Sequence, residues 1–294
     1  MTWKRILAVV VVALSAGAGR ADDIPFGADT LSQLVENAEI IIVAREARAL
    51  PHDAALADDP DRVAMHAYTV RATEVIDGAV VTGSELRIGV VGASDPPRVD
   101  EIDGAILFLQ LMSPAEVATS TMASGSPAYA VVSGEYGIVD GAVSGRKEAV
   151  RSYVEATRGR TLRSDEILQL ARRHLTSADL FLQRSGIIDL HLANEEAGAV
   201  QVLGEALMSS RVADEMKTSV IAALEDADMP AATAHLRAFA ENQAVQRGLR
   251  QAAIKAFRSL PGGDEQLRQW STTADPLLAP AARSALQSMG GKQP

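Results

Sequence analysis

Leu249-Arg250-Gln251-Ala252-Ala253-Ile254-Lys255-Ala256-Phe257 is the clearest of four versions of one motif in the C-terminal half. The motif runs apolar, basic, any, small, small, any, any, alanine, apolar. Looser versions begin at Leu182, Met216 and Leu278, so successive copies are offset by 34, 33 and 29 residues. A period of this size is typical of stacked helical units, each of which covers the hydrophobic face of its neighbour. The sequence therefore predicts an α-solenoid, an architecture that usually presents a surface to a partner.

Helix boundaries in this half follow from charges and prolines. Asp165 and Glu166 fall in the first turn after Ser164, where carboxylates are favourable, and Pro230 and Pro276 fall at first-turn positions. We predict four antiparallel helix pairs: 164–174 with 177–192, 197–209 with 212–227, 230–241 with 245–260, and 264–273 with 276–289.

The half before the repeats has the pattern of short strands. β-Branched runs and period-2 alternation, bounded by turn signals such as Asp77-Gly78, predict strands at 40–44, 68–75, 86–91, 106–111, 128–132 and 136–139. A helix over 30–37, capped by Thr30 or Asp29, precedes them. Six short strands predict a small antiparallel β-barrel or sandwich. The long loops 50–64 and 113–127 are candidate binding segments.

The predicted fold is therefore a two-domain α+β chain, with a barrel-like domain over 22–150, a linker over 151–163 and a helical repeat domain over 164–294. Charge divides the same way, because residues 22–150 hold 8 Lys and Arg against 21 Asp and Glu, while 151–294 hold 17 of each. The acidic half is a poor match for nucleic acid. It suits a basic protein or divalent cations, although solubility alone would also explain the charge.

Residues 1–21 have the pattern of an export signal. Lys4 and Arg5 precede an apolar run over 6–18, and small residues lead to cleavage after Ala21. The run is shorter than the roughly 20 residues that span a bilayer. We therefore expect a periplasmic or secreted bacterial protein with no membrane span after cleavage. The chain has no cysteine, which excludes disulfides and thiolate chemistry.

The motif at 249–257 resembles the second helix of HEAT-type repeats, over about 130 residues of the chain. This resemblance implies a right-handed α-solenoid with a protein-binding surface. The first copy departs from the pattern, because Asp189 replaces the alanine and Gly186 lies in mid-helix. It is either a full repeat or an N-terminal cap.

Residues 34–43 and 68–78 resemble exported OB-like barrels of the netrin/TIMP type. Inhibitors of that family chelate a protease zinc through an N-terminal cysteine. The chain lacks cysteine, so that mechanism does not carry over.

Catalytic motifs are not apparent. The histidines lack the spacing of a helical zinc pair; they are His52, His66, His174, His191 and His235. Ser144 and Lys147 have S-x-x-K spacing without the companion motifs of that chemistry. Phosphate-binding glycine loops are absent. We predict no catalytic residue, metal or cofactor.

The predicted contact residues are exposed cations on second helices and acids in a loop. They are Lys217, Arg250, Lys255, Asp58, Asp59 and Asp61. The alternatives are that the cations pair within the array, and that the acidic clusters at 58–61 and 100–103 are solvated loops or hold calcium. We expect an exported, non-enzymatic protein-interaction or scaffold protein of the bacterial envelope. A ligand- or cation-binding accessory to an extracytoplasmic enzyme and a structural envelope protein are the alternatives.

Overall fold

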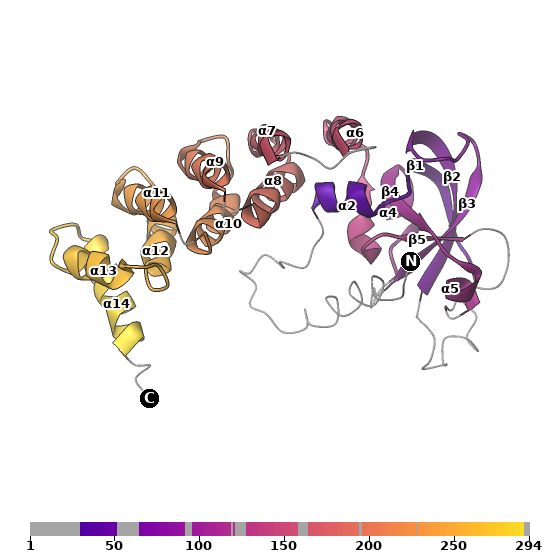
Figure 1. Cartoon of the computed structure of the whole chain (residues 1–294). Coiled ribbons are helices and arrows are strands. Elements are labelled where there is room, and N and C mark those ends of the chain that lie inside the picture. The colour runs from indigo at the N-terminus through magenta and orange to yellow at the C-terminus, as the bar shows by residue number, and fades with distance from the viewer. Residues whose placement is uncertain are drawn as a thin grey trace. The chain divides into compact units, whose positions relative to one another are not determined.

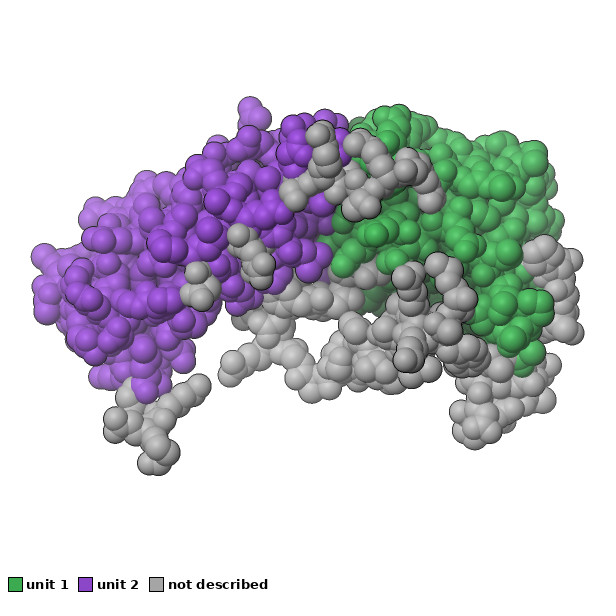
Figure 2. Space-filling view, viewed as in Figure 1, with its two compact units in different colours: residues 1–161 green, residues 162–294 purple. Residues whose placement is uncertain are grey.

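The computed structural model describes residues 30–51, 65–91, 96–118, 120, 128–157, 164–193, 196–227 and 229–290. The predicted signal peptide, 1–21, lies outside this range, as do Asp58, Asp59 and Asp61. The chain divides into two compact units, residues 1–161 and 162–294, coloured green and purple in Figure 2.

The first unit contains a closed five-stranded barrel (Figure 1). Its strands are β1 (Ile40–Ala49), β2 (Met65–Asp77), β3 (Glu85–Val91), β4 (Ala105–Leu111) and β5 (Ala128–Val131). The order is β1-β2-β3-β5-β4, and pairing of β1 with β4 closes it. A sixth strand, β6 (Ile138–Asp140), pairs with β4 beyond the end of β5. The predicted barrel and most strand positions are confirmed, with two differences: β3 and β5 are parallel, and the predicted strand 136–139 begins only at Ile138.

Closure of the barrel depends on irregular pairing between β1 and β2. Their register shifts at three places along β1, and Glu46 adopts a φ of 51° at one of them. Such bulges increase the local twist and bend a strand, which lets β1 contact both β2 and β4. The alternate residues that face inward form the core; they include Ile40, Ile42, Val70, Ile88, Leu107 and Leu109.

Short helices cover the barrel unit. The predicted N-terminal helix is α2 (Leu31–Asn37), and Thr30 caps it in a reciprocal hydrogen-bond pair with Gln33. Three more elements were too short to show in the sequence: α4 (Val99–Ile102), α5 (Pro114–Ala118) and the 3-10 turn η1 (Gly134–Gly137).

Helix α6 (Arg146–Thr157) corrects the predicted linker, because residues 151–157 are helical and belong to the first unit. Ala149, Val150 and Tyr153 form a buried stripe, and α6 packs against α2. On the opposite side, Lys147 and Arg151 pair with Glu74 of β2. These contacts explain why the helix continues past residue 150.

The second unit consists of helix pairs, close to the predicted boundaries. They are α7 (Ser164–Leu175) with α8 (Leu180–Leu192), α9 (Ala197–Met208) with α10 (Asp214–Glu225), α11 (Pro230–Glu241) with α12 (Arg247–Ala256), and α13 (Gly263–Ser271) with α14 (Leu278–Gly290). In Figure 1 the first helices form one row and the second helices another. One hydrophobic core runs through all four pairs, from Ala171 to Ala285. The predicted helical array is confirmed.

Two glycines allow helices of the array to approach each other closely. A side chain at Gly186 would lie 2.9 Å from the carbonyl oxygen of Ala171 and 3.2 Å from Cβ of His174. A Cβ at Gly204 would lie 2.3 Å from the ring of His235. The glycine that made the first copy atypical therefore allows α8 to pack closely on α7.

Candidate binding groove and array surface

An open groove of about 820 Å³ lies in the barrel unit. Two segments far apart in the sequence line it: residues 96–105, which include α4, and residues 135–142, which include β6. Five of its eleven lining residues are apolar or small, and the other six are charged. The charged side chains are Asp100, Glu101, Asp103, Glu135, Asp140 and Arg98. Five carboxylates against one guanidinium make the groove acidic.

The first of these segments is held in place by local hydrogen bonds. The backbone N–H of Arg98 donates to Glu101 at 3.0 Å, which caps α4. The buried hydroxyl of Tyr68 donates to the carbonyl oxygen of Pro97 at 2.6 Å. Gly104 has a φ of 92°, a conformation that glycine adopts without strain, and it turns the chain from α4 into β4. Hydrogen bonds thus hold the segment at Pro97 and at Arg98, and it ends in a tight turn at Gly104.

Two arginines compensate the acids on this side. Arg98 pairs with Glu101 at 3.1 Å and with Asp100 at 3.5 Å. Arg45 of β1 pairs with Asp103 at 3.4 Å. The hydrogen bonds from the Arg98 backbone and side chain lower the pKa of Glu101. The carboxylates near α4 therefore already have cationic partners.

The second side of the groove is different. Glu135 and Asp140 are exposed, and neither has a basic partner among the described residues. The Asp140 carboxylate accepts a hydrogen bond from the backbone N–H of Ala142 at 2.9 Å. Arg146 reaches the backbone carbonyl of Asp140 at 3.5 Å. Two carboxylates without an ion pair among the described residues therefore face this part of the groove.

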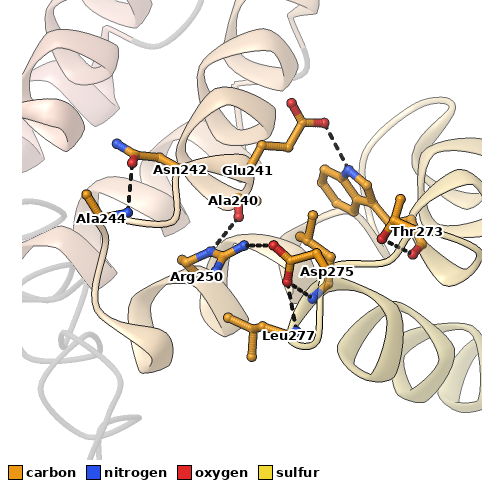
Figure 3. Close-up of polar contacts among 10 residues, drawn as sticks. Ala240, Glu241, Asn242, Ala244, Arg250, Thr273, Asp275 and Leu277 are labelled. Atoms are coloured by element: carbon orange, nitrogen blue, oxygen red, sulfur yellow. Dashed lines mark hydrogen bonds and ion pairs between the residues drawn. The ribbon is translucent and has the colours of Figure 1, made fainter.

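The structure corrects the predicted exposure of two contact residues, Arg250 and Lys217. Arg250 exposes 6% of its surface, so its predicted exposure is wrong. Its guanidinium donates to Asp275 at 2.9 Å and to the carbonyl oxygen of Ala240 at 2.8 Å (Figure 3). Asp275 in turn accepts from the N–H groups of Leu277 and Leu278 at the start of α14. The second motif position therefore serves an internal link between helix pairs.

The first copy uses the same position in the same way. Gln183 donates to the carbonyl oxygen of Arg211 at 2.9 Å and accepts from the N–H of Ala213 at 3.1 Å. It thereby holds the loop of the following pair, as Arg250 does. Lys217, the corresponding residue of the second copy, pairs with Asp214 of its own helix at 3.0 Å and is largely buried. These contacts fit the alternative that the cations pair within the array.

Lys255 is the predicted cation that lies at the surface. It belongs to α12, which together with α14 contains basic but no acidic residues; the exposed ones are Arg247, Lys255 and Arg283. The second-helix row therefore becomes cationic toward its C-terminal end, although residues 162–294 as a whole are nearly neutral.

The histidines of the described part do not form a site. His66, His174, His191 and His235 lie on four different elements, and His52 lies outside the described residues. Burial, with a smaller effect of Arg173, lowers the pKa of His174 to about 4. Within the described residues no three His, Asp or Glu side chains come together in a way that could hold a metal ion. Lys147 of the S-x-x-K pattern pairs with Glu74 at 3.3 Å.

Sequence reasoning found part of the groove and missed the rest. The acidic cluster at 100–103 was singled out, and the structure places it at α4 and the following turn. Glu135, Asp140 and Arg45 carry no motif, and the fold alone brings them near that cluster. Neither a protein-family model, a curated protein nor a solved structure matches the chain. Over the residues that the structure describes, no helix has the length and apolar character to cross a membrane.

Proposed function

We propose that this chain is an exported, non-enzymatic protein-interaction or scaffold protein of the bacterial envelope. The observation that carries the proposal is the helical array. Its four helix pairs share one core, which leaves an extended exposed face along each row of helices. Such arrays bind partners over a surface larger than one helix pair provides. Arg250 and Gln183 each bind the loop of the following helix pair, and these contacts hold successive pairs in fixed register.

The proposal includes a family resemblance for each unit: HEAT-like for the helical array and OB-like for the barrel. The two rows of helices and the second-position links support a HEAT-like array. The closed five-stranded barrel supports an OB-like identity for the first unit. In OB-like barrels the loops after strands 1 and 4 take part in binding. Here the connections after β1 and β4 correspond to the candidate segments 50–64 and 113–127, the second of which includes α5.

The test is site-specific photo-crosslinking of the full-length chain in a bacterium that produces it. A photoreactive residue at Lys255 probes the second-helix row, and one at Arg268 of α13 probes the first-helix row. We expect a discrete crosslinked protein species from one of the two rows. If neither position gives a crosslinked species, nor any other exposed position along the rows, the interaction proposal is wrong.

The acidic groove favours a second candidate, a ligand- or cation-binding accessory to an extracytoplasmic enzyme. Calcium takes six to eight oxygen ligands, and the groove carboxylates could supply at most two side chains to one ion, because no three acidic groups of the described residues come together. Calorimetric titration of the full chain with calcium tests this candidate. Saturable binding that is lost when Glu135 and Asp140 are neutralised would favour it over the scaffold.

A further inference from the structure

We propose that the acidic groove binds an extended segment of a partner protein, in which Lys or Arg residues alternate with apolar ones. This inference rests on the proposed protein-interaction function and names the chemistry of the partner. Three independent properties of the groove lead to it: its uncompensated charge, its apolar surface and its size.

The acids on the 135–142 side of the groove can bind a cation of a partner. Asp100, Glu101 and Asp103 already contact arginines of this chain. Glu135 and Asp140 are the exposed acids of the groove without such a partner in the described part of the chain. An incoming guanidinium or ammonium can pair with either one without displacing an existing ion pair. Charge complementarity of this kind speeds association and selects against acidic partners.

Apolar surface next to these acids gives the second property. Pro96, Pro97 and Ile138 line the groove. Val99 exposes 39% of its surface and Tyr136 exposes 44%, and they flank the lining residues in sequence. The lining residues Pro96, Pro97 and Ile138 thus give a partner's apolar residues a surface to contact, and the two exposed side chains each neighbour a lining residue in the chain. A tyrosine face also attracts a nearby cation.

The volume of the groove and the spacing of its carboxylates favour a peptide segment over a metal ion as the ligand. A volume of about 820 Å³ falls in the range of sites for sizeable ligands. No three of its acidic groups converge on one point that could hold a metal ion, as far as the described residues extend. Carboxylates spaced along a groove match several cations spaced along a chain.

The groove is also organised before any partner arrives. The cap on α4, the Tyr68 hydrogen bond to Pro97 and the turn at Gly104 fix one side. The Ala142 N–H orients the Asp140 carboxylate on the other. Binding therefore orders few groups of this chain, which lowers its entropic cost.

The experiment measures fluorescence anisotropy of the full-length chain with a labelled peptide of alternating arginine and leucine. The test variant is Glu135→Gln with Asp140→Asn, which keeps the acceptor for the Ala142 N–H. The matched control is Glu36→Gln with Glu85→Gln, which removes the same charge from exposed positions of the same unit outside the groove lining. We expect saturable binding that weakens about tenfold in the test variant and less than twofold in the control.

Three results would overturn the inference. The two double variants could weaken binding equally, which would make the attraction a property of net charge. A peptide of alternating glutamate and leucine could bind as well as the basic one. Calcium could bind saturably and displace the basic peptide, which would assign the groove to a cation.

The peptide-binding experiment can fail without the photo-crosslinking experiment failing, and the reverse is also true. If envelope proteins crosslink at the array positions while the peptide result is negative, the groove inference fails and the scaffold proposal stands. If the peptide binds in the groove but nothing crosslinks at any array position, the groove inference stands, and the proposal that the helical array carries the interaction is wrong.

Discussion

The barrel and the helical array bury apolar side chains in opposite ways, in a chain with no cysteine to form disulfides. The barrel closes by pairing β1 with β4, whose partners Ile40 and Leu109 lie far apart in the sequence. The array is built from contacts between neighbouring helices, repeated along the chain. Distant pairing makes a structure cooperative, because one lost strand opens the whole sheet. Repeated local contacts make stability a sum of links, each of which can fail separately.

The largest expected effect comes from breaking one link of the array. Arg250→Met leaves Asp275 without its cation in a site where the side chains expose 7% and 10%. Breaking a buried ion pair in this way costs about 3 kcal/mol. Hydrogen exchange on the full chain should show faster exchange in α13 and α14, with the barrel amides unchanged.

Arg237→Met is the matched control for this change, because Arg237 pairs with Glu241 at the surface, where both side chains are half-exposed. Its expected cost is below about 0.5 kcal/mol. Equal losses in the two variants would show that the buried link does not hold the last helix pair.

Acid should destabilise the array but not the barrel, by almost as much as the Arg250 substitution does. The folded pKa of His174 is about 4, below its ordinary value of 6.5, so the unfolded chain binds a proton between these pH values while the folded array does not. The array is therefore fully stable above pH 6.5 and loses about 1.4 kcal/mol per pH unit as pH falls, roughly 3 kcal/mol by pH 4.

The measurement is urea unfolding of the full chain from pH 7 to pH 4, followed by hydrogen exchange in each unit. His174→Asn should remove this slope from the array, whatever its starting stability. The barrel should lack the slope, because none of its described histidines is buried. A barrel that loses as much stability as the array would contradict the assignment to His174.

One glycine in each unit lies where an added Cβ would clash. A Cβ at Gly137 in the barrel unit meets the backbone oxygen of Val132 at 2.1 Å, whereas one at Gly204 in the array meets the His235 ring. Either glycine changed to alanine should destabilise its own unit by about 1–3 kcal/mol. Thermal unfolding, with hydrogen exchange to assign the unit, measures both.

The two clashes should respond differently to a second change. His235→Ala removes the side chain that obstructs Gly204→Ala, so the double variant should recover part of the loss. Gly137 meets backbone, which cannot be trimmed. Gly248→Ala is the control for helix propensity, because its Cβ meets open space, and it should stabilise by up to about 1 kcal/mol.

The smallest expected effect concerns the attachment of α6 to the barrel. Glu74→Gln removes the charge that pairs with Lys147 and Arg151, but all three side chains are about one-third or more exposed. We expect a loss below about 1 kcal/mol, read as faster hydrogen exchange in α6. Glu148→Gln is the control, since its pair with Arg151 is more exposed. A loss of several kcal/mol would mean that α6 depends on this pair more than on its buried stripe.

The two regions also differ in how far the sequence could predict them. Array boundaries followed from a repeated motif, capping carboxylates and prolines, which are all local signals. The β-strands followed from alternation, but their closure did not, because nothing near Ile40 in the sequence marks Leu109 as its partner. For the same reason α4 and α5 were missed, being too short for a periodic pattern.

The candidate site was predicted in part, for the same physical reason. The motif marked position 250 as special, but exposure depends on what the side chain meets, and Asp275 lies 25 residues further on. The acidic cluster at 100–103 was visible as a run of charges. Its assembly into a groove with Glu135 and Asp140 depends on the pairing of β4 with β6, which no spacing reveals.

The central position of β1 in the barrel determines where the chain can be cleaved or truncated without exposing strand edges. Because β1 pairs on one side with β2 and on the other with β4, a cleavage or deletion that releases it exposes two strand edges at once. Exposed edges are templates for intermolecular pairing, so the remaining sheet would be prone to aggregate. Fragments of the barrel unit for use as reagents should therefore begin before Thr30, so that α2 and the whole of β1 are retained.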